Sequence, residues 1–340
     1  MELSPLQHPP VGALRFNTDS SKMEYYDGNQ WVNITSDSPE AQTGGTRGCF
    51  MTGYDGPADR DTIDYINIST TGNSADFGDL VTGSGYKRGT ASRTRGIYSG
   101  GWEPAASATD IEYITISSTG NAIAFGQCTG GTQASNGASS ETRAIVHAGG
   151  AVPGGSANNT IEYVTISHTG NALDFGDQTA VISTSMHCSS PTRGVFGGGS
   201  IPSPSTTINT IQYITIATLG NAADFGDLTV IRNTGGSGGS ATRGVFMAGG
   251  TTPNANTDVI DYITIATLGD AIDFGNLTES TRGTCAVSST TRAVRTGGYV
   301  EQSTMDYIQI ATIGNATDFG DLVTAKRHIS GLSNAHGGLG

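Results

Sequence analysis

Residues 242–275 read TRGVFMAGGTTPNANTDVIDYITIATLGDAIDFG, and close variants of this stretch occur six times along the chain. The copies open with the Thr-Arg pairs at Thr46, Thr94, Thr142, Thr192, Thr242 and Thr291, which gives steps of 48, 48, 50, 50 and 49 residues. A fixed period in this range, with strand-like content, predicts a β-propeller of four-stranded blades. The repeat therefore predicts an all-β fold with six blades.

Each copy contains the signals for four strands. In the fifth copy the first apolar run ends at Gly249 and Gly250, which supply the backbone freedom that a sharp strand exit needs. The next strand covers residues 259–265, and both of its faces are largely apolar, as stacked blades require. A turn over residues 267–270 leads to an outer strand. Small residues over 284–289 predict an inner strand near the propeller axis.

Two aromatic ladders and one arginine ladder recur at fixed places in the repeat. Identical placement in every copy favours packing between blades over a functional aromatic surface. The aromatic members are Tyr65, Tyr113, Tyr163, Tyr213, Tyr262 and Tyr307, with Phe77, Phe125, Phe175, Phe225, Phe274 and Phe319. The arginines are Arg47, Arg95, Arg143, Arg193, Arg243 and Arg292. Five copies place an aspartate before the Phe, so we expect each arginine to bond either to that aspartate or to a backbone carbonyl.

The C-terminal segment, residues 328–340, lies where an inner strand is expected after the sixth copy. The first copy begins at Thr46 without a preceding inner strand of its own. We therefore expect the C-terminal segment to complete the first blade and to close the ring. Its deletion would expose strand edges.

The first 45 residues differ from the repeats. Three alternating segments, 11–18, 22–26 and 30–34, are separated by turn residues at 19–21 and 27–29, which predicts a three-stranded β-meander. The predicted domains are an attachment module with its linker at 1–40 and the propeller at 41–340. Three short strands bury too little surface to be stable alone, so the module needs a partner. That partner is the propeller, another copy of the module, or another protein.

The order of arginine-led strand, glycine pair, loop and tyrosine strand resembles the kelch repeat over residues 46–340. The resemblance is carried by Gly249-Gly250 with Tyr262, and by Gly149-Gly150 with Tyr163. The chain departs from the kelch pattern after the tyrosine, where it has a phenylalanine, placed later, instead of a tryptophan.

The N-terminal string from Gly12 to Trp31, GALRFNT followed by KMEYYDGNQW, resembles a small module common in tail fibres and related virion proteins of tailed bacteriophages. The repeats are also similar to repeat proteins of marine and cyanobacterial phages. The resemblance implies attachment to a virion through this module, with the propeller held outward. It implies virion tail proteins as partners, a host-surface protein or glycan as a target, and synthesis in the host cytoplasm. The attachment residues expected are Arg15, Phe16, Tyr25, Tyr26 and Trp31.

Composition argues against several classes of partner. The chain has 17 basic and 30 acidic residues, a formal charge of -13, which disfavours nucleic acid and anionic membranes. No apolar segment is long enough for a signal sequence or a membrane span. The four cysteines occupy unlike repeat positions without CxxC spacing, which predicts buried thiols instead of a disulfide or zinc framework.

The residues that carry catalytic chemistry are scattered. The six histidines occupy unrelated repeat positions, so they do not form the metal site of a kelch-type copper radical oxidase. Glu103, Glu141, Glu279 and Glu301 are also dispersed, whereas glycoside hydrolysis needs two carboxylates at one pocket. The sequence therefore predicts no enzyme, no cofactor and no metal site, and an ordinary acidic turn at Asp55, although it leaves calcium binding there open.

The loops after the glycine pairs vary most between copies and are expected to share one rim of the propeller. Exposed aromatic residues there, Tyr54, Trp102 and Tyr299, are the predicted contacts to a sugar or protein surface. The leading interpretation is a non-enzymatic structural protein of a phage tail or tail fibre. Two alternatives remain: a soluble intracellular kelch-like scaffold that binds proteins, and a glycan-degrading propeller enzyme.

Overall fold

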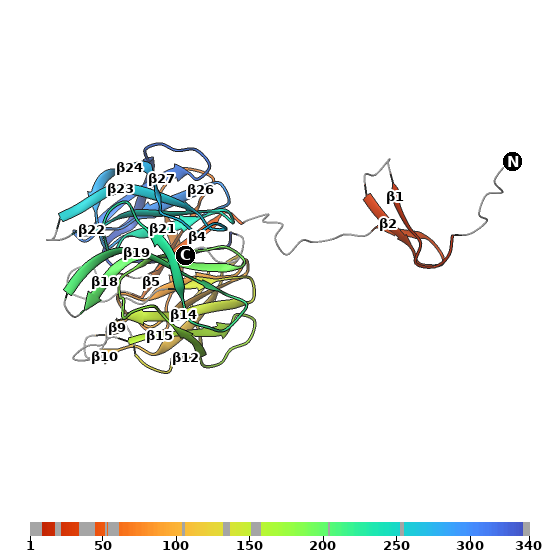
Figure 1. The fold of residues 1–340 in the computed structure, drawn as a ribbon, viewed down its shortest axis with the longest axis horizontal. Coiled ribbons are helices and arrows are strands. Elements are labelled where there is room, and N and C mark those ends of the chain that lie inside the picture. The colour runs from red at the N-terminus through yellow and green to blue at the C-terminus, as the bar shows by residue number, and fades with distance from the viewer. Residues whose placement is uncertain are drawn as a thin grey trace. The chain divides into compact units, whose positions relative to one another are not determined.

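The computed structural model describes residues 9–17, 22–33, 45–51, 53, 61–103, 106–131, 137–150, 158–202, 205–251 and 255–335. Every regular element among these residues is a strand, so the all-β prediction is confirmed. The chain divides into two compact units, Met1–Ala41 and Gln42–Gly340, which Figure 1 draws as ribbons.

The smaller unit contains one antiparallel sheet in the order β1-β2-β3, which is the meander expected from the sequence. Its strands are β1 (Leu14–Asn17), β2 (Lys22–Tyr26) and β3 (Trp31–Asn33). The predicted turn between β2 and β3 forms because the Asp27 carboxylate accepts hydrogen bonds from the backbone N–H groups of Asn29 and Gln30, at 2.7 and 2.8 Å. Gly28 takes a φ of 104°, which a residue with a side chain rarely adopts. The other predicted turn, at 19–21, lies outside the described residues.

The larger unit contains six four-stranded antiparallel sheets, here called the first to sixth sheets. The first sheet consists of β29 (Ser330–Ser333), β4 (Arg47–Met51), β5 (Thr62–Asn67) and β6 (Ala75–Asp79). The second consists of β7 (Arg88–Ala91), β8 (Arg95–Ser99), β11 (Asp110–Thr115) and β12 (Ile123–Gln127). The third consists of β13 (Ala138–Ser139), β14 (Arg143–Gly150), β15 (Asn158–Thr165) and β16 (Leu173–Asp177).

The remaining three sheets repeat this order. The fourth consists of β17 (Met186–Ser189), β18 (Arg193–Pro202), β19 (Ser205–Thr215) and β20 (Ala223–Asp227). The fifth consists of β21 (Gly236–Gly239), β22 (Arg243–Thr251), β23 (Ala255–Thr264) and β24 (Ile272–Thr281). The sixth consists of β25 (Cys285–Ser288), β26 (Arg292–Thr296), β27 (Gln302–Gln309) and β28 (Thr317–Lys326). A short hairpin, β9 (Trp102–Glu103) with β10 (Ala106–Ser107), extends from the second sheet.

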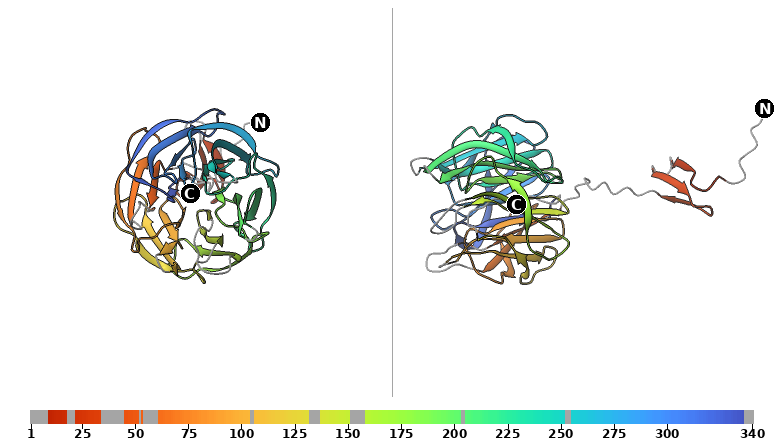
Figure 2. Two further views of the ribbon diagram at one scale, coloured as in Figure 1. Left: turned by 90° about the vertical axis from the view of Figure 1, so that its left-hand side faces the viewer. Right: turned by 60° about the horizontal axis from the view of Figure 1, so that its bottom comes forward.

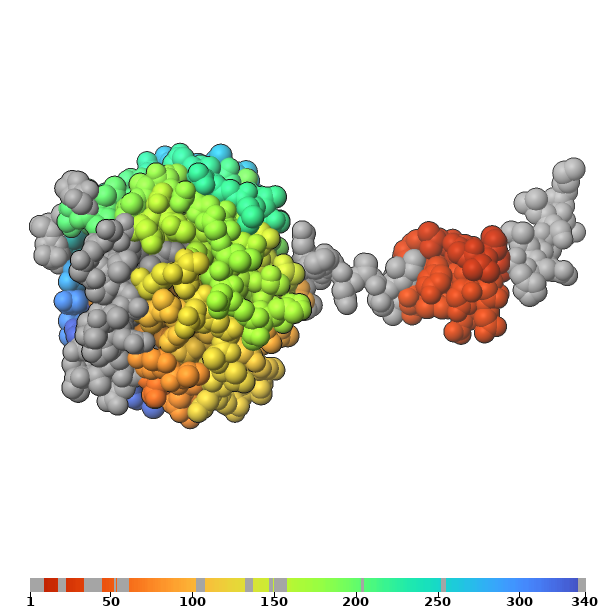
Figure 3. Space-filling model, turned by 90° about the horizontal axis from the view of Figure 1, so that it is seen from below, coloured from red at the N-terminus to blue at the C-terminus, as the bar shows by residue number. Residues whose placement is uncertain are grey.

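The C-terminal strand completes the first sheet, as the sequence predicts. β29 pairs antiparallel with β4, and Leu332 lies opposite Cys49 in this register. The sheets follow one another around a common centre in the order of the sequence, as the left view of Figure 2 shows. On the face drawn in Figure 3, the coloured surfaces of successive sheets adjoin one another.

One hydrophobic cluster joins each pair of consecutive sheets. Between the fourth and fifth sheets, for example, Phe225 belongs to the same cluster as Phe246 and Ile263. A further cluster joins the sixth sheet to the first and contains Phe319 and Phe50. All six ladder phenylalanines are exposed by 4% or less, which agrees with their predicted packing role. Each ladder tyrosine packs edge-on against the phenylalanine of its own sheet, with ring centroids 5.9–6.1 Å apart.

The arginine ladder bonds to backbone carbonyls of the next sheet, which was one of the two predicted alternatives. Each guanidinium donates to an isoleucine carbonyl at 2.7–3.1 Å, and Arg292 of the sixth sheet donates to Ile68 of the first. Each guanidinium also lies 4.2–4.8 Å from the centroid of its ladder tyrosine. The aspartates of the other alternative, Asp76, Asp174, Asp224, Asp273 and Asp318, are exposed.

The repeated turn glycines also bond between sheets. The backbone N–H of Gly269 donates to the carbonyl of Phe225, at 2.9 Å, and the five equivalent turns make the same bond at 2.8–2.9 Å. A Cβ atom on the outer-strand glycine Gly226 would lie 2.5 Å from the carbonyl oxygen of Gly269. The glycine of the Asp-Phe-Gly segment is therefore required by this close approach between neighbouring sheets.

Serine hydroxyls connect the inner strands of neighbouring sheets. Ser330 accepts a hydrogen bond from the backbone N–H of Gly89, at 2.9 Å, and Ser333 donates to the carbonyl of Ser288, at 2.7 Å. Ser139, Ser189, Ser237 and Ser288 make corresponding contacts between the other sheets. Small residues are required here because the inner strands approach one another closely, as the sequence predicts. The four cysteines are free and buried, which confirms that prediction also.

A ladder of buried polar residues, which the sequence reading treated as part of an apolar strand, precedes the ladder tyrosines. Its members are Asp64, Glu112, Glu162, Gln212, Asp261 and Asp306, each exposed by 4% or less. Buried cations pair with four of them: Lys326 with Asp64, Lys87 with Glu112, Arg232 with Asp261, and Arg295 with Asp306. Threonine hydroxyls of the preceding sheet also donate to Asp261 and Asp306, both at 2.6 Å. Buried cations therefore neutralise four of the five acids in this ladder.

Candidate functional site

The connections that lead into the inner strands lie beside the ends of the glycine-pair strands. Ser183 forms a β-bridge with Ser200, and Asn233 forms one with Gly250. The connections and the predicted rim loops therefore meet at the same end of these sheets.

Of the three predicted rim residues, Tyr299 is the one whose side chain lies within the described part of the chain. Tyr54 lies outside the described residues. Trp102 lies in β9, and its side chain is outside the described part of the chain. Tyr299 is 41% exposed, and its ring meets His328 edge-on with centroids 5.6 Å apart. Tyr86 stacks on the same histidine at 4.2 Å. The structure therefore brings Tyr299 together with two aromatic residues that the sequence reading did not select.

Arginines surround these rings. The guanidinium of Arg282 lies 4.3 Å from the centroid of Tyr299, and that of Arg327 lies 5.7 Å away. We call Tyr86, Arg282, Tyr299, Arg327 and His328 the aromatic–arginine cluster. Burial, followed by the charges of Arg327, Arg88 and Arg282, lowers the pKa of His328 to about 4. At neutral pH this cluster is therefore cationic through its arginines, in a chain with a formal charge of -13.

A cavity of about 40 Å³ adjoins the cluster, because Tyr86 and His328 belong to both. The other lining residues come from the inner strands and their connections, and include Arg88, His187 and Thr284. No Asp or Glu is among the described lining residues. The sequence reading missed this site, although Arg88 and His187 are large residues in inner strands of otherwise small ones.

Burial controls the protonation of the groups in the cavity. It lowers the pKa of Arg88 to about 10, so the guanidinium is still charged at neutral pH. Burial and the nearby charge of Arg88 lower the pKa of His187 to about 3, so its imidazole is neutral. Burial raises the pKa of the Cys285 thiol, which stays protonated. The positive charge of the cavity therefore comes from Arg88 alone among these three groups.

The lowered pKa of His187 makes the stability of the protein depend on pH. The pKa of His187 is about 3 in the folded protein, whereas the pKa of an unfolded histidine is about 6.5. Its contribution to stability is thus complete above pH 6.5 and is lost as the pH falls toward 3. Between pH 6 and 4 this residue contributes a slope of about 1.4 kcal/mol per pH unit to the free energy of unfolding.

We expect His187→Ser to reduce that slope by about 1.4 kcal/mol per pH unit. Serine is the matched replacement because Ser237 occupies the equivalent position opposite Phe246 in the fifth sheet, as His187 lies opposite Phe196. Urea unfolding near pH 6, 5 and 4 measures the slope for both proteins. An identical slope in the variant would contradict the neutral, buried histidine.

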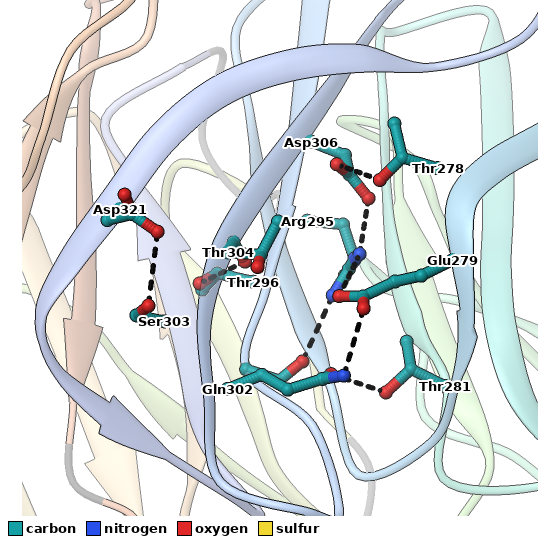
Figure 4. A network of polar contacts seen from close by, with 11 residues as sticks. Thr278, Glu279, Thr281, Arg295, Thr296, Gln302, Ser303, Thr304, Asp306 and Asp321 are labelled. Atoms are coloured by element: carbon teal, nitrogen blue, oxygen red, sulfur yellow. Dashed lines mark hydrogen bonds and ion pairs between the residues drawn. The ribbon is translucent and has the colours of Figure 1, made fainter.

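Three of the four carboxylates considered for glycoside hydrolysis are engaged in other contacts, and the side chain of Glu103 lies outside the described part of the chain. Figure 4 shows Arg295 between Asp306 and Glu279, and Glu279 also accepts a hydrogen bond from Gln302 at 3.1 Å. Asp306 has no exposed side-chain surface, so it cannot reach a glycan. Glu141 pairs with Arg93 at 2.8 Å, and Glu301 lies 3.8 Å from Arg327. These acids therefore form separate contacts to arginines instead of one carboxylate pair at a pocket.

The predicted attachment residues are divided between the two faces of the small sheet. Arg15, Tyr26 and Trp31 lie on one face, where Arg15 pairs with Glu24 at 2.7 Å and its guanidinium lies 4.3 Å from the ring of Trp31. Tyr26 contacts Trp31, with ring centroids 5.5 Å apart. Hydrogen bonds from Asn17 and Arg15 lower the pKa of Glu24. This polar face is therefore internally paired.

The opposite face of the small sheet is apolar and exposed. Strand register places Leu14 beside Tyr25 and Phe16 beside Met23. The exposed fractions are 63% for Leu14, 58% for Phe16, 43% for Met23 and 39% for Tyr25. We call these four residues the apolar face. Contiguous apolar side chains of this kind mark an interaction surface.

The described ranges contain neither a metal-binding cluster nor a membrane-spanning helix. No group of three or more His, Cys, Asp or Glu side chains there is placed to hold a metal ion. The segment around Asp55, where calcium binding was left open, lies outside those ranges. None of the described segments forms a helix able to span a membrane. Comparison with known proteins yields no matching family model and no similar curated protein.

Proposed function

We propose that this protein is a non-enzymatic structural component of a tailed-phage virion, on the tail or a tail fibre. In this proposal the N-terminal module attaches to another tail protein, and a six-bladed, kelch-like propeller presents a binding surface to a virion protein or to the host surface. The single observation that carries the proposal is the apolar face of the small sheet, joined to the resemblance of residues 12–31 to phage tail modules.

The contacts between the sixth and first sheets support a closed, six-bladed propeller. These sheets share a hydrophobic cluster, a guanidinium–carbonyl bond from Arg292 to Ile68, and the turn bond from Gly72 to Phe319. Each contact has counterparts between the other consecutive sheets. Among the described residues, each of the six sheets has equivalent contacts to the sheet before it and to the sheet after it, which supports the arrangement of propeller blades.

The contacts at the two ends of β29 support presentation of the rim to a binding partner. The backbone N–H of Gly45 donates to the carbonyl of Asn334 at 3.1 Å, so the linker enters beside the end of β29. Ser330, at the start of β29, lines the cavity. Gly45, at the end of the linker, and the aromatic–arginine cluster are thus at opposite ends of the same inner strand.

The attachment step is tested with charged substitutions on the apolar face. We expect Leu14→Asp with Phe16→Asp to remove the protein from purified phage particles, because burying two carboxylates in an apolar contact is unfavourable. The melting temperature of the larger unit should be unchanged. The matched control is Ile123→Asp, which alters a side chain that is 57% exposed on β12. Immunogold labelling with antibody to residues 46–335 measures incorporation.

The outcomes separate the proposal from its alternatives. Gold at one reproducible place on wild-type particles, and its loss with the double variant, supports a virion tail protein. Unlabelled particles, with the protein present only in infected-cell lysate, would contradict the proposal and favour a soluble scaffold. Release of reducing ends from host glycan, abolished by a single carboxylate substitution, would favour the enzyme.

A further inference from the structure

We propose that the aromatic–arginine cluster binds a carboxylate group of an acidic polysaccharide, and that Arg282 is the residue that contacts this carboxylate. Such a polysaccharide would be the host-surface target in the function proposed above, on which this inference rests. Three observations carry it: the repeat positions of the two exposed-end arginines, the fixed backbone that presents them, and the lack of an acidic partner for Arg282 among the described residues.

Arginines occupy equivalent positions in two consecutive sheets. Arg282 precedes Gly283 in the connection into β25, and Arg327 precedes His328 in the connection into β29. Tyr299 lies in the loop between β26 and β27, and both guanidinium groups approach its ring. The corresponding residues in the second, fourth and fifth sheets are uncharged: Gly85, Ser183 and Asn233. The positive charge is therefore specific to the sixth and first sheets and is not a property of the repeat.

Hydrogen bonds between neighbouring sheets fix the backbone of these connections. The N–H of Thr234 donates to the carbonyl of Thr184 at 2.9 Å, and the N–H of Gly283 donates to Thr234 at 2.7 Å. His328 continues the series by donating to Gly283 at 3.0 Å. Thr184, Thr234 and His328 have φ values of 59°, 59–7° lower and 53°, respectively, in the left-handed region that branched residues rarely adopt. Backbone of this kind is concentrated at binding sites, where the surrounding structure holds it.

The side chain of Arg282 is held in place although it lacks a polar partner. Its guanidinium lies 4.3 Å from the centroid of the Tyr299 ring. Its stem passes over Gly250, where a Cβ atom would lie 2.9 Å from Cδ of the arginine. Among the described residues, this guanidinium has no hydrogen bond and no ion pair. An arginine that stacks on a ring keeps the N–H groups at its edge free to donate to an oxyanion.

The acids near the cluster are engaged with other cations. Glu301 lies 3.8 Å from Nε of Arg327, which is longer than a hydrogen bond. Glu279 pairs with Arg295 at 3.4 Å and accepts a hydrogen bond from Gln302. The charge of Arg282 is therefore left without a counter-charge in the described part of the chain, although the whole chain has a formal charge of -13.

The pairing of a charge with a ring favours an acidic saccharide. A guanidinium can bind a carboxylate through two parallel N–H groups. Tyr299 is 41% exposed and offers ring surface and a hydroxyl beside that charge. A uronate unit matches both, because its carboxylate is bonded to a ring with apolar C–H faces. The carboxylate of an aspartate or glutamate is on a flexible chain and offers the tyrosine no ring to contact.

The test uses the full chain and tetragalacturonate as the probe. Isothermal titration at about 0.15 M salt, which screens the net negative charge of the protein, should show saturable binding. Arg282→Asn copies the residue of the fifth sheet and should weaken binding by more than about tenfold, as expected for loss of a charged hydrogen bond. Tyr299→Ala should weaken binding by about fivefold, because it removes the ring that holds the guanidinium.

The matched control is Arg93→Asn, which removes a guanidinium that pairs with Glu141 and lies outside the cluster. This variant should bind tetragalacturonate like the wild type. All variants should melt like the wild type, because Arg282 and Tyr299 belong to none of the hydrophobic clusters between sheets. Equal weakening in Arg93→Asn would overturn the proposal, because it would show a general effect of charge.

Two further probes test the chemistry of the ligand. The methyl ester of tetragalacturonate should not bind, and equal binding of this ester would overturn the carboxylate contact. Hexaglutamate should bind at least tenfold more weakly, by about the value of one charged hydrogen bond, and equal binding would overturn the saccharide in favour of an acidic protein partner. Absence of saturable binding to both tetragalacturonate and an alginate tetramer would leave Arg282 as a solvated side chain and would also overturn the proposal.

These measurements use purified protein, so they fail independently of the proposed function. Loss of saccharide binding together with gold at one place on phage particles would remove this target and leave the virion role in place. Unlabelled particles together with saturable binding to tetragalacturonate would support the saccharide site and contradict the virion role.

Discussion

A chain that ends at Arg327 is expected to lose cooperative folding altogether. The truncation removes β29, which supplies Leu332 to the cluster between the first and second sheets and follows Ile329 of the cluster between the sixth and first. Loss of a buried Leu or Ile side chain costs about 2–5 kcal/mol each, and a domain is stable by only about 5–15 kcal/mol in total. The truncation also leaves the edge of β4 unpaired.

Thermal melting followed by circular dichroism, together with size-exclusion chromatography, measures this loss. The matched control ends at Ala335 and keeps every contact described for β29, so it should melt as the full chain does. A circular permutant that places residues 328–335 before Thr46 supplies the same strand from the other terminus and should restore folding. If the chain ending at Arg327 melted cooperatively within a few degrees of the full chain, the closing role of β29 would be wrong.

The second large effect is expected for Asp261→Ala. Asp261 and its partner Arg232 are both fully buried and lie 2.8 Å apart. Removing the carboxylate leaves the guanidinium buried without that partner, which typically costs about 3–5 kcal/mol. The hydroxyl and backbone N–H of Thr229 lose their acceptor as well. Urea unfolding at neutral pH measures the change in the free energy of unfolding.

The fourth sheet provides the control for this substitution. There the equivalent position is Gln212, whose amide oxygen accepts from the backbone N–H and the hydroxyl of Thr179, at 3.0 and 3.1 Å. Replacing the pair by Arg232→Met with Asp261→Gln copies this neutral arrangement and should recover most of the lost stability. Gln212→Ala should cost only about 1–2 kcal/mol, since it removes neutral hydrogen bonds. Equal costs for Asp261→Ala and Gln212→Ala would contradict a charge effect.

The repeat predicted much of the observed fold because its signals are local. Glycine pairs, alternating side chains and turn residues act within one copy, so the positions of the four strands could be assigned in each. Helix was correctly excluded on the same grounds. The role of β29 also followed from counting, since the first copy lacks an inner strand and the last has one to spare.

The partners of charged residues were harder to predict. The sequence allowed the ladder arginines two acceptors, and only the structure assigns them to isoleucine carbonyls of the next sheet. Five of the six copies also have an acid before the ladder tyrosine, and nothing in the sequence indicated that Asp261 or Asp306 would be buried. The partner of each charged side chain depends on which groups of the neighbouring sheet lie about 3 Å away. The spacing of residues along one strand does not specify that distance.

The sequence by itself determined the all-β class, the six copies, the strand order within each copy and the separate meander at the N-terminus. Only the tertiary structure decided which faces are covered, which ions are paired and where the cavity lies. Arg88 and His187 belong to different repeats, and they line one cavity only because inner strands of several sheets converge. Their charge states follow from burial, a property of the assembled sheets that no single repeat possesses.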